Sequence, residues 1–160
     1  MYVYAGPREL LAQVRPGVMG APIGSSTDID GLAPDDEPFT YVVDLEGTLR
    51  IAPRRSEHVA CAGGRPVLAA GEIAFERMHG EWRVTEVSNQ STGYCPDPAS
   101  WPEVAEALDR AGIARPDGFT ATFVFRHCPG CGELNVVKDE DYVCVFCGCG
   151  LSGLSGLSGP

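Results

Sequence analysis

Two Cys-x-x-Cys-Gly segments near the C-terminus constrain the fold of this chain more than any other feature of its sequence. Cys128 and Cys131 form the first pair, and Cys144 and Cys147 form the second pair. The spacing allows both sulfurs of a pair to face one point, and the glycine allows the backbone conformation needed where the turn ends. Two such turns supply the four thiolates of a zinc site of the ribbon type. The sequence therefore predicts a structural Zn²⁺ ion bound by these four cysteines; disulfides or free thiols are the alternative.

The residues between the two cysteine pairs predict a short hairpin. A strand from 134 to 138, an acidic turn from 139 to 141 and a return strand from 142 to 145 would bring the second pair back to the first. The predicted zinc ribbon spans residues 127–150. The acidic turn makes this segment negative, and the whole chain has a formal net charge of −10. Because like charges repel, this charge disfavours nucleic acid as a partner.

The ribbon segment contains two further side chains of metal-ligand type. Cys149 lies two residues after Cys147 and offers an alternative fourth sulfur, but the glycine that follows Cys147 favours Cys147 as the ligand. His127 directly precedes the first pair and is expected to flank the site. Cys61 and Cys95 lie far from the pairs, and we expect them to be a small buried residue and an ordinary loop thiol.

Residues 39–126 predict a small α+β domain built on an antiparallel sheet. The residues from 41 to 51 indicate one hairpin with a turn at Gly47, and those from 73 to 87 indicate a second hairpin with a turn near Gly80. The chain between the hairpins is rich in glycine and alanine. Such composition indicates that two backbones, or a backbone and a ligand, approach each other closely.

The same domain is expected to contain one main helix, from 101 to 111. Ser100 and Glu103 have the spacing of a capping box at its start, and Gly112 would end it. A strand from 120 to 125 would then lead into the first cysteine pair. The helix would face the sheet with its apolar side, which consists of Val104, Ala107, Leu108 and Ala111.

The two ends of the chain predict little regular structure. Residues 1–38 are interpreted as an irregular N-terminal segment, because proline and glycine are frequent from 15 to 38. Residues 151–160 repeat Leu-Ser-Gly and are interpreted as a flexible tail or linker. The alternative is a docking peptide whose regularly spaced leucines enter a groove of another protein.

The sequence predicts a cytoplasmic protein that does not enter a membrane. The first residues lack the basic start of an export signal, and no apolar run approaches the length of a membrane span. Thiolate ligands without an export signal favour a reducing compartment.

A set of polar and small residues between 58 and 96 follows a recognisable order. Its members are His58, Gly64, Val67, Ala70, Gly71, Glu72, Asn89, Ser91, Tyr94 and Pro96. This pattern resembles a domain found in the C-terminal part of plant IQ-motif proteins and in bacterial toxin-associated proteins, whose signature has the form HSSFLAGG, then AGE, then NxSGHYxP. The resemblance implies a domain rather than a known reaction.

The chain departs from that signature at two places. Val59 and Ala60 stand where the family has a pair of serines, and Thr92 and Gly93 stand where the family has Gly-His. The second loop has therefore lost a histidine, so any site that used that imidazole would be altered here. The chain also contains no basic IQ-type helix, so calmodulin binding is not implied.

Four residues of this region are candidates for catalysis. His58, Glu72, Ser91 and Tyr94 supply a base, a carboxylate and two hydroxyls, the groups that nucleophilic catalysis uses. No nucleophile-elbow sequence surrounds the serine. In the structural alternative, His58 binds a loop carbonyl, Glu72 caps or pairs, and the serine closes a turn. The sequence favours this alternative.

The interpretation that best fits these observations is a non-enzymatic, zinc-binding protein that recognises another protein or acts as an adaptor. One alternative is an enzyme with a pocket around the four candidates above. The other is a cargo protein directed by its leucine-repeat tail.

Overall fold

The computed structural model describes residues 1–32 and 37–151 of the 160-residue chain. The chain forms two compact units, residues 1–122 and residues 123–160. The second unit thus begins a few residues before 127, where the sequence places the start of the ribbon. Each unit is described by itself below, and the part of the predicted tail from 152 to 160 lies outside the described residues.

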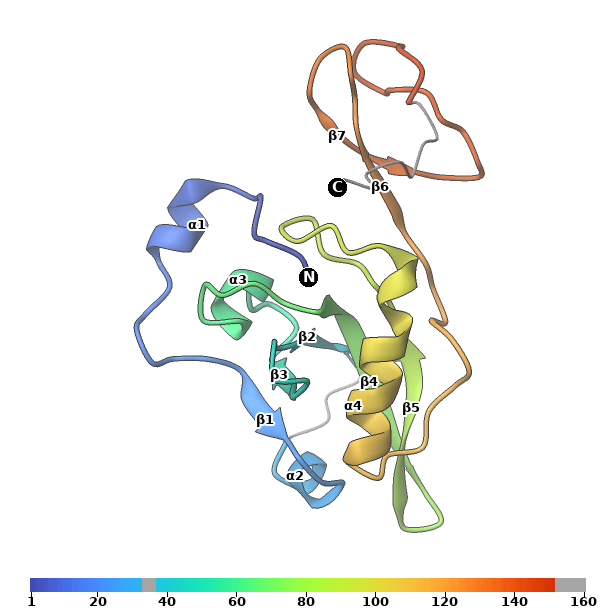
Figure 1. Ribbon diagram of the computed structural model, residues 1–160. Coiled ribbons are helices and arrows are strands. Elements are labelled where there is room, and N and C mark those ends of the chain that lie inside the picture. The colour runs from blue at the N-terminus through green and yellow to red at the C-terminus, as the bar shows by residue number, and fades with distance from the viewer. Residues whose placement is uncertain (33–36, 152–160) are drawn as a thin grey trace. The chain divides into compact units, whose positions relative to one another are not determined.

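The first unit is α+β, as predicted from the sequence (Figure 1). Its elements are, in chain order, α1 (Arg8–Ala12), β1 (Ala21–Ile23), α2 (Thr27–Asp30), β2 (Phe39–Val43), β3 (Leu49–Ala52), α3 (His58–Cys61), β4 (Ala69–Met78), β5 (Glu81–Val87), the 3₁₀ turn η1 (Pro98–Ser100) and α4 (Trp101–Arg110).

The strands form one antiparallel sheet in the order β1-β3-β2-β4-β5. Both predicted hairpins are confirmed, since β2 pairs with β3 and β4 pairs with β5. The turns lie where the sequence places them: Gly47 has φ +80°, and His79 and Gly80 have φ +52° and +81°. Positive φ at both central residues matches the right-handed twist of a tight hairpin.

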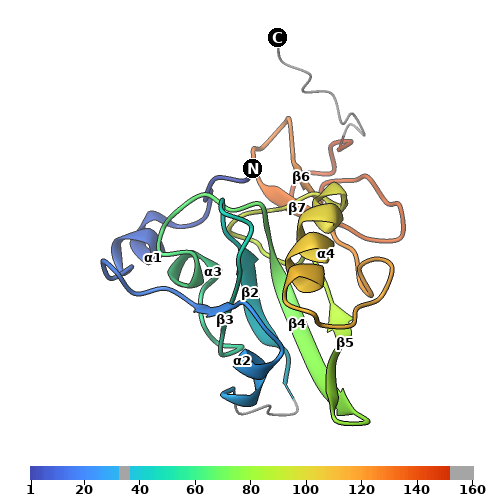
Figure 2. The same cartoon turned by 60° about the horizontal axis from the view of Figure 1, so that its bottom comes forward.

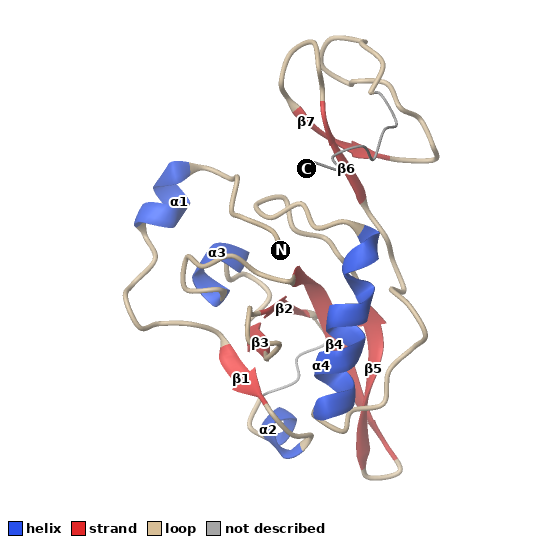
Figure 3. Ribbon diagram, viewed as in Figure 1, coloured by secondary structure: helices blue, strands red, loops and turns tan. Residues whose placement is uncertain are grey.

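The sheet is covered on both faces, because alternate residues of each strand point to opposite sides. Tyr41 and Val43 of β2 pack in one apolar cluster with α4, which lies along β4 and β5 (Figure 3). Val42, between them, belongs to a second cluster with residues of α3 and Tyr94. In Figure 2, α3 and α4 accordingly lie on opposite sides of the strands.

The main helix is confirmed, but its predicted capping box is wrong. The apolar side of α4 is buried as expected, and Gly112 ends the helix at φ +68°. Ser100 has helical backbone angles and makes no capping bond, because η1 extends the helix by a turn. The cap lies instead at Asp97, whose carboxylate accepts from the N–H of Ala99 at 2.8 Å.

The N-terminal segment is more ordered than its composition indicates. The prediction of an irregular segment fails at β1 and α2, since β1 pairs with β3 at the edge of the sheet. An edge strand tolerates Pro22, which has no N–H to donate. Ile23 and Ile29 are buried in the core, and this long-range packing holds a segment that has weak local preferences.

The second unit contains β6 (Val124–His127) and β7 (Leu134–Val137), which pair antiparallel around the first cysteine turn. The predicted hairpin partner of β7 is therefore wrong. Within the described residues, the segment from 142 to 145 makes only an isolated bridge, between Val143 and Gly150. Each cysteine turn reverses the chain by itself, so each brings its own flanking residues together. The strand that the sequence predicts from 120 to 125 is also shorter at its start, since β6 begins at Val124.

The first leucine of the predicted tail belongs to the second unit. Leu151 is buried against Cys128, Cys144 and Val137, and its N–H donates to the carbonyl of Tyr142 at 2.7 Å. The packed part of the second unit therefore includes residue 151, one beyond the limit of 150 predicted for the ribbon.

A close contact between backbones explains one glycine of the sheet. A Cβ atom on Gly71, in β4, would lie 1.9 Å from the carbonyl oxygen of Ser88. The same oxygen accepts from the hydroxyl of the buried Tyr41 at 2.8 Å. The expectation of a close approach in the glycine- and alanine-rich stretch is confirmed here.

Replacing Gly71 tests this contact. Gly71→Ala should lower the free energy of unfolding by roughly 3 kcal/mol, because the methyl group must push the Ser88 backbone away. Urea unfolding followed by tryptophan fluorescence measures the loss, since Trp82 and Trp101 are the only tryptophans and both lie in the first unit. Gly118→Ala is the control, because no heavy atom lies within 4 Å of its Cβ position. Equal stability of the two variants would contradict the contact.

Candidate functional site

The first cysteine pair lies in a turn closed by two backbone hydrogen bonds. The N–H of Cys128 donates to the carbonyl of Glu133 at 2.9 Å, and the N–H of Gly132 donates back to the carbonyl of Cys128 at 2.8 Å. The N–H of Gly130 points at the Cys128 sulfur, 3.3 Å away. These bonds place both cysteine side chains on the inner side of the turn.

The second cysteine turn repeats the geometry of the first. The N–H of Cys144 donates to the carbonyl of Cys149 at 2.8 Å, and the N–H of Gly148 donates to the carbonyl of Cys144 at 2.9 Å. The glycines that follow each pair, Gly132 and Gly148, have φ +78° and +74°. This left-handed conformation is the one for which the sequence predicted glycine.

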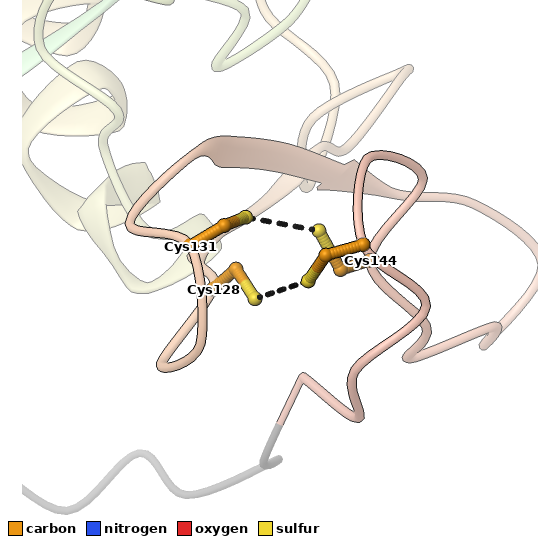
Figure 4. Close-up of side chains that lie close together, drawn as sticks. Cys128, Cys131 and Cys144 are labelled. Carbon is orange, nitrogen blue, oxygen red and sulfur yellow. Dashed lines mark hydrogen bonds between the residues drawn. The ribbon is translucent and has the colours of Figure 1, made fainter.

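The two turns bring the four predicted ligand sulfurs together. All four Sγ atoms lie within 4.8 Å of one another. The sulfurs of Cys128 and Cys147 are 3.5 Å apart, and those of Cys131 and Cys144 are 3.6 Å apart (Figure 4). A metal ion bound tetrahedrally at the usual zinc–sulfur distance of about 2.3 Å would space its sulfurs about 3.8 Å apart. The cluster therefore has the geometry of a four-thiolate metal site.

The same distances exclude disulfide bonds among these residues. A disulfide brings two sulfurs to about 2.05 Å, and none of the seven cysteines of the chain forms a disulfide. Of the alternatives that the sequence left open, pairing of these cysteines by disulfides is not what the structure contains.

Asn135 is a residue of the site that sequence reasoning missed. It lies in β7 with 4% of its surface exposed, and its side-chain amide donates to the carbonyl of Glu133 at 3.0 Å and reaches the Cys144 sulfur at 3.5 Å. Its carbonyl oxygen accepts from the N–H of Val145 at 3.0 Å. One side chain thus joins both cysteine turns. The available signal was an amide among the apolar residues of a strand, since buried polar groups need partners.

The electrostatics of the cluster favour a bound cation. Burial raises the pKa of Cys144, but two N–H groups of the second turn and the Asn135 amide outweigh it and lower that pKa to about 6. The N–H of Glu133 lowers the pKa of Cys131, whereas desolvation and the neighbouring sulfurs raise it to about 12. Cys144 therefore loses its proton readily, whereas Cys131 keeps its proton, because two adjacent negative charges repel each other.

The two neighbouring side chains of ligand type lie outside this cluster. Cys149 is exposed and lies beside Gly130, where a Cβ atom would be 2.8 Å from its sulfur. His127 is exposed, and its Nδ1 donates to the carbonyl of Gly132 at 3.3 Å. Among the described residues, the cluster that fits a metal ion consists of the four predicted cysteines.

The catalytic candidate His58 binds backbone. Its Nε2 donates to the carbonyl of Gly71 at 2.8 Å. Burial lowers the pKa of the imidazole, while the bond to Gly71 and the charge of Glu72 raise it, and burial prevails. The histidine is therefore neutral at pH 7 and joins α3 to β4. Glu72 follows Gly71 in β4 and is half-buried.

The other candidates also bond to backbone groups. The N–H of Tyr94 donates to the hydroxyl of Ser91 at 3.3 Å, and the Tyr94 hydroxyl donates to the carbonyl of Arg65 at 2.7 Å. Burial raises the pKa of Tyr94, so the phenol stays protonated. The nearby Asn89 amide donates to the carbonyl of Pro96 at 2.9 Å. Within the described residues, no hydrogen bond joins the side chains of two candidates, which favours the structural alternative.

A cavity of the first unit lies elsewhere. It has a volume of about 740 Å³, and its lining includes Met19, Phe39 and Ile51 as well as Arg54 and Arg55. None of the four catalytic candidates lines it. No sequence motif indicated this cavity, because its walls come from separate parts of the chain and combine apolar residues with a few charged ones.

Comparisons of the chain with protein-family models, with curated proteins and with solved structures gave no significant match. Among the described residues, no helix is both long enough and apolar enough to cross a bilayer.

The buried His58 predicts a dependence of stability on pH. Because folding lowers its pKa, the unfolded chain takes up a proton that the folded chain does not as the pH falls below about 6.5. The first unit should therefore lose stability between about pH 7 and pH 5, and His58→Gln should flatten that loss. Urea midpoints, measured by tryptophan fluorescence at several pH values, give the slope of stability against pH. His79→Asn, at an exposed position in the β4–β5 turn, is the control and should keep the wild-type slope; an unchanged slope in His58→Gln would refute the assignment.

Proposed function

We propose that the chain binds one Zn²⁺ ion through Cys128, Cys131, Cys144 and Cys147, and that the metal holds a module whose role is to recognise another protein. The observation that carries this proposal is the approach of the four sulfurs to within 4.8 Å of one another on two matching turns. Cysteine sulfur in a tetrahedral set is the ligand set of structural zinc.

The metal in this proposal is structural rather than catalytic. Four thiolates fill a tetrahedral shell, so no position is open for a water molecule or a substrate. The described residues around the cluster supply a small apolar core, which consists of Val137, Leu151 and the two buried cysteines. Zinc binding would therefore contribute most of the free energy that folds this unit. A zinc site of free thiols also suits a reducing, bacterial-type cytoplasm, which we propose as the compartment.

Recognition of a protein is the role that the surface chemistry supports. The described residues of the second unit include four acidic and two basic side chains, a balance that opposes phosphate backbones. Large apolar side chains are exposed in the same unit, and exposed apolar clusters are typical of protein-binding surfaces. We also propose that residues 58–96 form the domain that their signature resembles, and that the polar residues of the signature hold loops in place.

Metal analysis tests the zinc site. The purified chain should contain one zinc ion, and Cys144→Ser should lose it because the remaining three sulfurs no longer close the shell. Cobalt substitution should give the strong sulfur-to-metal charge-transfer absorption of a four-thiolate centre. Cys149→Ser is the matched control, since this exposed cysteine lies outside the cluster, and it should retain the metal. Loss of zinc in Cys149→Ser with retention in Cys147→Ser would contradict the ligand set.

Removing the amide that joins the two turns should weaken the site. Asn135→Ala should lower zinc affinity by about tenfold or more, because groups that hold metal ligands in place typically contribute this much. Competition with a chelator of known affinity measures the change. Val136→Ala, in the neighbouring position of β7, is the control for lost packing. An affinity reduced equally in both variants would show that Asn135 acts only through packing.

A further inference from the structure

The second cysteine turn and the residues before it expose a group of apolar side chains, which we call the knuckle patch. Its members are Tyr142, Val143, Val145 and Phe146, with 38%, 48%, 81% and 64% of their surfaces exposed. Val145 and Phe146 are the two residues between Cys144 and Cys147. The patch therefore lies directly on the turn that holds two of the proposed zinc ligands.

The two cysteine turns provide an internal comparison. Both have the same backbone hydrogen bonds and the same left-handed glycine, but the first turn carries Pro129 and Gly130 where the second carries Val145 and Phe146. The turn thus forms without large apolar side chains at these positions. Exposed valine and phenylalanine favour aggregation and add nothing to the turn. Their presence indicates a contact outside the unit.

Hydrogen bonds fix the backbone that carries the patch. The N–H of Val145 donates to the buried Asn135, and the N–H of Cys144 donates across the turn to Cys149. A surface fixed in advance loses less conformational entropy on binding.

The charges beside the patch select the chemistry of the partner. Asp139, Glu140 and Asp141 directly precede it and are all exposed, in a turn closed by the N–H of Asp141 and the carbonyl of Lys138. Four thiolates around Zn²⁺ would add two further negative charges. A partner with the opposite charge at its rim fits this surface, because complementary charges steer association and exclude wrong partners.

We propose that the knuckle patch docks a protein segment whose aliphatic or aromatic residues are flanked by lysine or arginine. This inference rests on the proposed zinc-stabilised recognition module and names its partner class. A second copy of the chain fits less well, since its formal net charge is −10 and it would present the same acidic turn. Anionic membranes and nucleic acids are disfavoured for the same electrostatic reason.

Peptide selection tests the proposal. Zinc-loaded full-length chain is immobilised and used to select from a phage library of short random peptides. The enriched peptides should combine aromatic or aliphatic residues with flanking lysine or arginine. A synthetic peptide of the most enriched sequence should bind the chain in solution, with an affinity that falls as salt is raised.

Variants locate the binding surface. The double variant V145S/F146S should lower the affinity for the synthetic peptide about tenfold or more, since central apolar side chains contribute most of the affinity of such contacts. The triple variant D139N/E140Q/D141N should lower this affinity less, and the affinity should then depend less on salt. V3S/V18S is the matched control, because these valines of the first unit are 63% and 57% exposed, and it should bind as wild type does. Zinc content is measured for every variant, and one zinc ion per chain shows that the second unit is intact.

Several results would overturn the proposal. It fails if no peptide is enriched, if the enriched peptides carry no basic residues, or if V145S/F146S with its zinc intact binds them unchanged. A dimer of the wild-type chain that V145S/F146S abolishes would assign the patch to a second copy. Sedimentation with phosphatidylcholine vesicles that depends on Phe146 would assign it to a lipid surface. A wild-type chain that contains no zinc would overturn the proposed function itself, so the two failures are distinguishable.

Discussion

Mutual repulsion of negative charges is the constraint on which the second unit depends. Four sulfurs within 4.8 Å of one another cannot all ionise without a cation among them. Although the N–H of Glu133 lowers the pKa of Cys131, desolvation and the neighbouring sulfurs raise it, whereas the pKa of Cys144, which burial raises, is lowered overall by N–H groups of its own turn and by Asn135. The apolar core around them is too small to hold the chain by burial alone. Asn135, the paired turns and Leu151 therefore position a four-sulfur centre that, under the proposed function, a metal ion would stabilise.

The first unit depends on burial instead. Its sheet is covered on both faces, and the loop after β5 crosses β4 so closely that only a glycine fits at position 71. His58 and Tyr94 bind backbone carbonyls around this crossing. Several residues of the signature-like set, among them His58, Gly71 and Tyr94, thus have a structural role in the packing of this unit.

Local patterns predicted the hairpins, the buried side of α4 and the cysteine cluster, because each depends on residues that are near one another in the chain or on the fixed geometry of a metal site. Features that depend on distant residues could not be read in this way. Strand β1 exists because β3 offers an edge and the core accepts Ile23. Ser100 lost its capping role because a 3₁₀ turn lengthened the helix. Asn135 gained its role only when the fold placed it between two turns.

The comparison of the two cysteine turns also separates what the fold requires from what it does not. The cysteines and the glycines Gly132 and Gly148 occur in both turns and are explained by the four-sulfur cluster and the backbone that forms it. Pro129 and Gly130 satisfy the same backbone as Val145 and Phe146, so the apolar pair of the second turn has no explanation within the turn. The catalytic candidates differ in this respect, because the hydrogen bonds of His58, Ser91 and Tyr94 already serve the loop around β4. A binding function is best sought at exposed side chains that have no packing role in the fold. Among the described residues, Val145 and Phe146 of the second turn are such side chains.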